Sequence, residues 1–175
     1  MTTPDDTAFR TDAPFIAGER EMLQSWLDYH RGTLLWKAAG LTGDELARPG
    51  VEPSKMSLVG LIRHMTEVER WWFQRCLAGQ EVSMRYWSQE YPDGDFDLID
   101  PTRTDDDIQT FKDQIAASDA EAAGRDLDSV FKHPTWDGHP EMSLRWVYVH
   151  LIEEYARHNG HADLLRERID GATGE

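Results

Sequence analysis

Apolar residues recur three or four positions apart along four long stretches of the chain, the spacing that places them on one face of a helix. Pro14 suits the first position of the first helix, and Gly79 and Gly171 are stop signals after the second and the fourth. Ser143 is the expected N-cap of the fourth helix. The pattern predicts four long helices, over residues 14–40, 55–78, 104–124 and 143–169.

Three connections join these helices. Residues 41–54 are expected to form a loop with one short turn, and residues 80–103 form an unusually long connection of the kind that often carries function. A third connection covers residues 125–142, and residues 1–13 are expected to be a polar tail. The predicted fold class is therefore all-α, a single four-helix bundle domain over residues 14–171 with long loops.

The third connection contains a short extended pair in this interpretation. Its strands are expected around Val130–Phe131 and around Trp136, and Asp137–Gly138 is a turn signal. His133 and His139 lie in the same segment, where we expect both imidazoles to face solvent.

Charge and composition restrict the function classes. The chain has 33 acidic and 18 basic residues, a net charge of −15, which disfavours nucleic acid and anionic membranes as partners. No apolar run is long enough to span a bilayer, and the N-terminus lacks the features of a signal peptide. Cys76 is the one cysteine, so neither a disulfide framework nor a cysteine-rich zinc site can form within the chain. These features predict a cytoplasmic protein.

The fourth helix carries ionisable residues where apolar ones are expected. At about 100° per residue, Glu154 shares one arc with His150, His158, His161 and the apolar Leu151. Burial of such groups is costly unless they are paired or bind a metal. Glu154 and His158 lie one helical turn apart, a spacing that offers two metal ligands from one rigid element.

A third ligand must come from another helix. His64 is the candidate on the second helix, because it lies on the same stripe as Leu61 and Val68. Three such donors predict a metal site inside the bundle. The alternatives are that His64 is a core histidine with its hydrogen bonds satisfied and that Glu154 and His158 form a buried pair without a metal.

The remaining imidazoles of the fourth helix have less definite roles. His161 is interpreted as a residue that orients a ligand, with direct ligation as the alternative. His150 is interpreted as a pocket wall or a hydrogen-bond partner of the site.

Two segments resemble a known family. The segment SLVGLIRHMTEVERWWF at residues 57–73 and the segment HLIEEYARHNGHADLLRE at residues 150–167 are similar to the DinB-like superfamily. The similarity is greatest to its actinobacterial mini-circle branch, which is related to mycothiol-dependent metalloenzymes. The resemblance extends from about residue 15 to residue 171.

The resemblance implies a four-helix bundle that holds a divalent metal by three side chains, one histidine from the second helix and two residues four positions apart on the last. In this sequence these positions are His64, Glu154 and His158. Many members have a second histidine in place of Glu154 and Arg-Gly-Gln in place of Asn159–His161. The His/Glu/His set resembles the mycothiol-dependent maleylpyruvate isomerase relatives.

The metal and the assembly follow from the same resemblance. Three ligands with open positions fit catalytic Zn²⁺, which is our first choice, and two histidines with one carboxylate also fit Ni²⁺ or Fe²⁺. Because related bundles often pair, the resemblance also implies a homodimer.

The resemblance implies an enzyme that uses a low-molecular-weight thiol. A metal-bound thiolate of the mycothiol type would attack a small electrophile, so the predicted activity is a thiol S-transferase. One alternative is a metal-dependent hydrolase in which Glu67, one turn after His64, acts as the base. Another is a non-enzymatic, stress-related metal-binding protein.

Several side chains are candidates for the substrate pocket. Trp71 and Tyr155 are expected to form apolar walls, although both also suit a packed core. Cys76 is interpreted as a small packed residue, because the end of a helix disfavours a thiolate.

Overall fold

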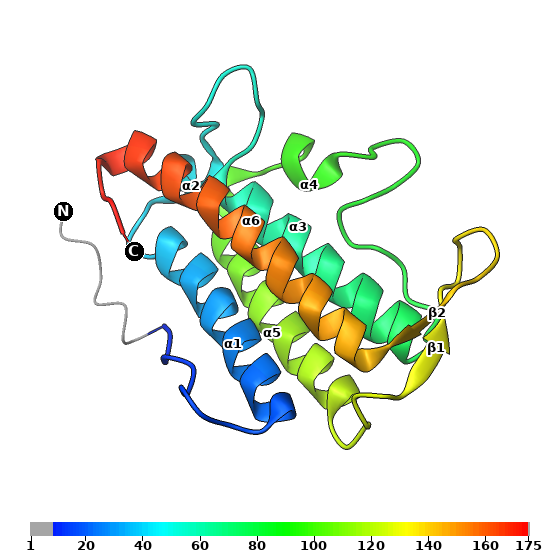
Figure 1. Cartoon of the computed structure of the whole chain (residues 1–175). Helices are drawn as coiled ribbons and strands as arrows, with labels where there is room; N and C mark the ends of the chain where they lie inside the picture. The colour runs from blue at the N-terminus through cyan, green and yellow to red at the C-terminus, as the bar shows by residue number, and fades with distance from the viewer. Residues whose placement is uncertain (1–8, 175) are drawn as a thin grey trace.

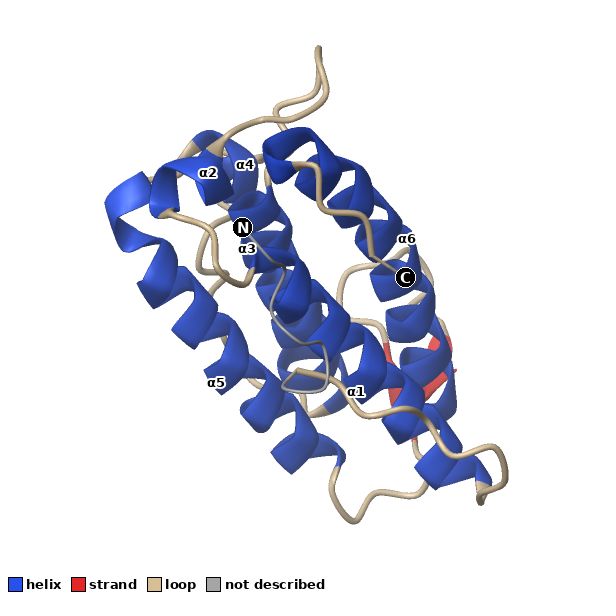
Figure 2. Cartoon of the chain, turned by 90° about the vertical axis from the view of Figure 1, so that its left-hand side faces the viewer, coloured by secondary structure: helices blue, strands red, loops and turns tan. Residues whose placement is uncertain are grey.

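A computed structural model describes residues 9–174 of the protein, and these residues are mostly helical. Helix α1 packs along α6, while α3 packs against both α5 and α6 (Figures 1 and 2). The π-helix η2 continues α3 without a break. The four long helical segments are α1 (Glu19–Ala38), α3 (Leu58–Glu69) with η2 (Arg70–Leu77), α5 (Thr104–Ala122) and α6 (Leu144–Asp170).

Short elements fill the connections. In the described residues these are α2 (Gly43–Ala47), α4 (Gly94–Asp97), η3 (Pro101–Arg103), β1 (Val130–Lys132) and β2 (Glu141–Ser143). The two strands pair antiparallel, with Phe131 opposite Met142. The sheet is confined to one end of the helices (Figure 2), so the predicted helical class holds with this small addition.

The first helix begins later than expected. Its first residue is Glu19, and the predicted start at Pro14 is wrong. Phe15 and Ile16 are fully exposed, at 101% and 94%. Because this segment has no core to pack against, its apolar residues give no reason to form a further helical turn.

The second long segment begins at Leu58, later than the predicted residue 55, and changes its helix type. Ser57 is the N-cap, and its hydroxyl accepts the Gly60 N–H at 3.2 Å. From Arg70 the hydrogen bonds span five residues, as in the bond from the Ala78 N–H to the Phe73 carbonyl. Such π-helical turns are frequent at functional sites.

The ends of α6 confirm the sequence signals. The Ser143 hydroxyl accepts the Trp146 N–H at 3.2 Å, and Gly171 ends the helix with a φ of +77°. In the hairpin before α6, the strand at Val130–Phe131 is confirmed, but the strand expected around Trp136 is wrong. The returning strand lies at Glu141–Ser143, so Trp136 belongs to the loop between the strands.

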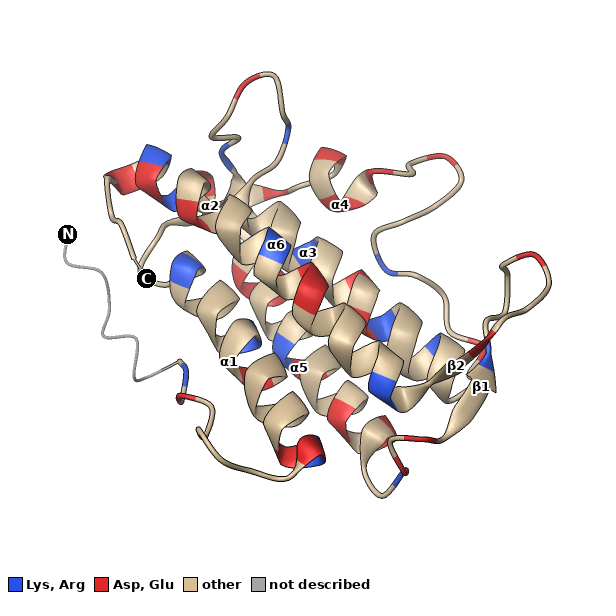
Figure 3. Cartoon of the chain, viewed as in Figure 1, with Lys and Arg blue, Asp and Glu red and all other residues tan. Residues whose placement is uncertain are grey.

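The core contains charges as well as apolar side chains. Leu61, Phe111 and Leu151 are 0% exposed, and so is Glu69. Acidic and basic positions are otherwise interspersed over helices and loops (Figure 3). None of the helices in residues 9–174 has the length and apolarity needed to cross a membrane.

Candidate metal centre

The structure brings together the three residues proposed as ligands. One donor atom from each of His64, Glu154 and His158 lies within 4.8 Å of the others. The His158 Nε2 is 3.5 Å from the Glu154 Oε2, and the rings of His64 and His158 are 4.8 Å apart. We call these three residues the candidate triad.

Helix packing produces this convergence. Glu154 and His158 project from successive turns of α6, and His64 faces them from α3, which packs against α6. The side chains of Glu154 and His158 are 17% and 11% exposed, and that of His64 is 30% exposed. The site is therefore mostly buried but open on the His64 side.

His64 is oriented by a carboxylate that the sequence analysis did not identify. Its Nδ1 is 2.9 Å from the Asp95 Oδ2, a bond in which the imidazole donates and the carboxylate accepts. The Nε2 lone pair is then available to a ligand, the arrangement typical of metal-bound histidines. Asp95 is one acid among many in residues 80–103, so no sequence signal distinguishes it.

A glycine allows α4 to approach His64 closely. A Cβ atom built on Gly60, one turn before His64, would lie 2.6 Å from the Phe96 ring. Phe96 packs 5.8 Å from the His64 ring, and it follows Asp95 in α4. The missing side chain at Gly60 thus makes room for the short helix that supplies Asp95.

Burial keeps the His158 imidazole neutral. Loss of hydration, together with the nearby imidazoles of His64 and His161 and the charge of Arg157, lowers the pKa of His158 to about 4. The ring therefore has a free lone pair at neutral pH. Its Nδ1 is 3.4 Å from the His161 Nδ1, so His161 lies next to a proposed ligand.

His150 lies on the other side of Glu154. Its Nε2 is 3.7 Å from the Glu154 Oε1, and its ring stacks on Trp146 at 4.7 Å. Trp72 meets the same ring edge-on at 4.9 Å. His150 therefore connects Glu154 to a group of aromatic side chains.

A cavity of about 320 Å³ opens next to the triad. His64 and Asp95 form part of its lining, and most of the rest is apolar. Its aromatic walls are Trp71, Trp72, Trp87 and Phe96. We call it the aromatic cavity, and it is large enough for a small organic molecule.

Glu67 lines the aromatic cavity and fixes one of its walls. Its Oε1 accepts backbone N–H groups from Arg85 at 2.6 Å, from Tyr86, and from Trp87 at 3.2 Å. Its Oε2 is buried and has no hydrogen-bond partner among the described residues. Glu67 thus ties the long connection to α3.

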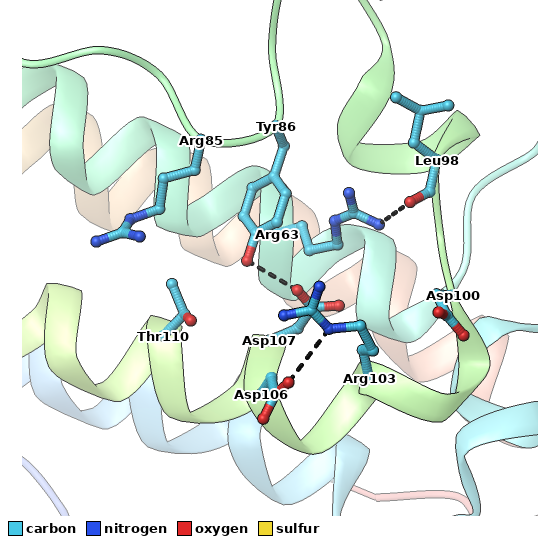
Figure 4. A pocket seen from close by; sticks show the side chains of 9 residues that line it. All are labelled: Arg63, Arg85, Tyr86, Leu98, Asp100, Arg103, Asp106, Asp107 and Thr110. Carbon is cyan, nitrogen blue, oxygen red and sulfur yellow. Dashed lines mark hydrogen bonds and ion pairs between the residues drawn. The ribbon is translucent and has the colours of Figure 1, made fainter.

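Arg63 also holds this connection, and it lines a second cavity together with Arg85 and Arg103 (Figure 4). Arg63 donates to the carbonyls of Leu98 at 2.8 Å and Gly94 at 3.1 Å, and its guanidinium lies over the Tyr86 ring. The Tyr86 hydroxyl donates to Asp107 on α5. These bonds fix both ends of α4, the helix that carries Asp95.

Tyr155, a pocket candidate, and Cys76 both lie in the core. Tyr155 is 0% exposed and its hydroxyl donates to the Glu69 Oε1 at 2.9 Å, so it belongs to the core instead of a pocket wall. Cys76 is 4% exposed, and burial raises the pKa of its thiol to about 12. This agrees with the interpretation of Cys76 as a packed residue.

His133 is not solvated as expected. It is 1% exposed, stacks on Trp136 at 4.2 Å and meets Trp72 at 5.5 Å. Its Nδ1 accepts the Trp136 N–H at 3.0 Å, which folds the hairpin loop over the ring. Aromatic packing, which periodicity cannot reveal in a loop, explains this burial. The expectation that His139 faces solvent is confirmed, since His139 is exposed.

The donor set fits a divalent metal. Two imidazoles and one carboxylate converge, and the neutral state of His158 and the bond from His64 to Asp95 leave lone pairs for a cation. Zn²⁺, Ni²⁺ and Fe²⁺ all accept this combination. These acceptor atoms face one another, and the Arg157 guanidinium lies 3.6 Å from Glu154 on their exposed side.

Comparison with known proteins identifies one family. Residues 22–171 match the family described as Mycothiol-S-transferase. The match agrees with the resemblance to the DinB-like superfamily. No curated protein and no solved structure gives a significant match.

Proposed function

Because the chain belongs to the mycothiol S-transferase family, we propose that it joins the sulfur of a mycothiol-type thiol to a small electrophile, with His64, Glu154 and His158 holding a divalent metal. The convergence of these donors beside the aromatic cavity is the observation that carries the proposal. We further infer that the four long helical segments form a four-helix bundle of the DinB-like type. A homodimer and a cytoplasmic location stay predictions.

The thiol must come from a small molecule. Cys76 is the one cysteine of the sequence, and it is buried with a strongly raised pKa. When bound, a divalent metal supplies Lewis acidity that lowers the pKa of a thiol, so that thiolate is present near neutral pH.

The chain's own residues prepare the site. Asp95 holds the His64 ring, and burial keeps His158 neutral. Trp71 and Trp72 line the adjacent cavity, and such apolar walls would shield a bound nucleophile from the hydration that weakens it. Glu67 keeps Trp87 in place through its backbone N–H.

The proposed reaction is balanced without an oxidant. The thiol loses its proton, and its sulfur forms a bond to an electrophilic carbon. The leaving group departs with the bonding electron pair and takes up one proton. The products are therefore a thioether and the protonated leaving group.

Metal analysis combined with an S-transfer assay tests the proposal. We expect about one metal ion per chain in the wild type, and loss of both metal and transfer from mycothiol to a bimane electrophile in His64→Ala, Glu154→Ala and His158→Ala. Plasma mass spectrometry measures the metal. Glu167→Ala, at an exposed position of the same helix, is the matched control and should keep its metal.

Three results would contradict parts of the proposal. A wild type without stoichiometric metal rejects the site. Loss of metal in His161→Ala with retention in Glu154→Ala shows that the ligand choice is wrong. Consumption of the electrophile at an equal rate without thiol shows hydrolysis instead of transfer.

A further inference from the structure

The aromatic cavity has an unusual combination of walls. Trp71, Trp72, Trp87 and Phe96 line it, and so do the carboxylates of Glu67, Asp93 and Asp95. Among the described residues of its lining there is no Lys or Arg. Aromatic faces carry negative potential, so the walls and the acids attract the same kind of group.

Glu67 adds a specific signal to this arrangement. It is 5% exposed, and its Oε1 is fully engaged by backbone N–H groups of residues 85–87. Its Oε2 accepts no hydrogen bond from the described residues, and the charge of Arg70 reaches the carboxylate only through space. A buried carboxylate oxygen without a donor is costly, and a cation or a donor in the neighbouring cavity would relieve the cost.

The same features disfavour anions. A substrate carboxylate in the cavity would meet three acids and no basic side chain. Two arginines lie close by without lining the cavity: Arg75 is 5.8 Å from the centroid of the Trp71 ring, and Arg63 is occupied by the carbonyls of Gly94 and Leu98. A neutral apolar molecule would fill the cavity but would leave the Glu67 oxygen unpaired.

We propose that the electrophilic substrate carries an organic cation, such as an alkylated ammonium group, and that this group occupies the aromatic cavity between Trp71, Trp87 and the Glu67 carboxylate. The inference rests on the proposed function only in calling the occupant a substrate. Recognition of the cation by aromatic faces and a carboxylate does not depend on the reaction.

A titration with three molecules of one shape tests the proposal. Choline carries the cation, and 3,3-dimethylbutan-1-ol (neohexanol) has a carbon atom in place of the nitrogen. The anion is 3,3-dimethylbutanoate. Binding to the purified full-length protein is followed by the indole N–H signals in NMR spectra. We expect choline to bind about ten-fold more tightly than neohexanol, and no binding of the anion.

Variants assign the preference to the cavity. We expect Trp87→Leu to weaken choline binding roughly three- to ten-fold, and because Trp87 is 49% exposed the fold should not change. Glu67→Gln should reduce the preference for choline over neohexanol to about two-fold. Asp93→Asn, at an exposed position, serves if Glu67→Gln does not fold. Asp44→Asn, exposed on α2, is the control and should bind as the wild type does.

The outcomes separate this inference from the proposed function. Equal affinity for choline and neohexanol, or unchanged binding in Trp87→Leu, overturns the inference. Because no thiol or electrophile is present in the titration, a clear preference for choline in a protein that transfers no sulfur counts against the proposed function alone. A protein that transfers sulfur but binds choline no more tightly than neohexanol counts against this inference alone.

Discussion

Two clusters of ionisable side chains lie between α3 and α6, and they differ in how their charges are satisfied. In the core, Arg31 from α1 meets Glu69 with two hydrogen bonds of 2.7 and 2.9 Å, and Tyr155 adds a third to the same carboxylate. In the candidate triad, a carboxylate and two imidazoles face one another as acceptors.

The difference shows which buried polar group points to function. Glu154 and Tyr155 are neighbours in sequence, yet Glu154 belongs to the triad and Tyr155 to the hydrogen-bonded network of Arg31 and Glu69, which we call the closed network. The Arg31–Glu69 cluster contains its own cation, so it needs nothing from outside. Among residues 9–174, Arg157 is the basic side chain paired with the triad, and it lies 3.6 Å from Glu154 on a half-exposed side chain. A bound divalent metal would supply the positive charge that Arg31 supplies to Glu69 in the core.

Removal of the carboxylate from the closed network should have the largest effect on stability. Glu69→Ala leaves Arg31 charged and buried, and we expect the free energy of unfolding to fall by about 3–5 kcal/mol. Denaturant unfolding measures the change. Glu167→Ala, at an exposed position of α6, should change it by less than about 0.5 kcal/mol. Similar losses in both variants would show that the network is not a distinct source of stability.

Acid should destabilise the protein through the triad. With metal removed, His158 takes up a proton near pH 6.5 in the unfolded chain but only near pH 4 in the folded one. The neutral His158 therefore supports the fold fully above pH 6.5. As the pH falls from 6.5 to 4, the free energy of unfolding decreases by up to about 3 kcal/mol. The free energy of unfolding, measured with denaturant at several pH values in this range, should depend less on pH in His158→Asn than in the wild type. Parallel curves for the two proteins would contradict the assignment.

The smallest effect should come from the residue that orients His64. Asp95→Asn removes the charge that accepts from the imidazole, and we expect metal affinity to fall about 10- to 100-fold. Competition with a chelator measures it. Asp97→Asn is the matched control on the same short helix, where Asp97 pairs with Lys55 instead. An equal loss in both variants would indicate a general disturbance of α4.

Local signals explain what the sequence analysis predicted correctly. Ser143 and Gly171 bound α6 as expected, because capping and positive φ depend on the residue itself. His64, Glu154 and His158 were selected as candidates because ionisable residues interrupt two apolar stripes, and their donor atoms do lie within 4.8 Å of one another. The start at Pro14 failed because its apolar neighbours, Phe15 and Ile16, do not reach the core.

Features that depend on tertiary contacts were not predictable. Asp95 acts through a bond to His64, 31 residues away, and its own segment shows only a loop with many acids. The burial of His133 depends on Trp72 and Trp136, which meet only in the folded protein. The change to a π-helix at Arg70 leaves no mark in the apolar spacing.

The position of Asp95 makes the long connection part of the candidate metal centre. If Asp95 strengthens the hold of His64 on a cation, the cation must stabilise the folded connection by the same free energy, since such couplings are reciprocal. Cleavage of this connection by a protease would then slow as the site fills, and an intact connection would report occupancy.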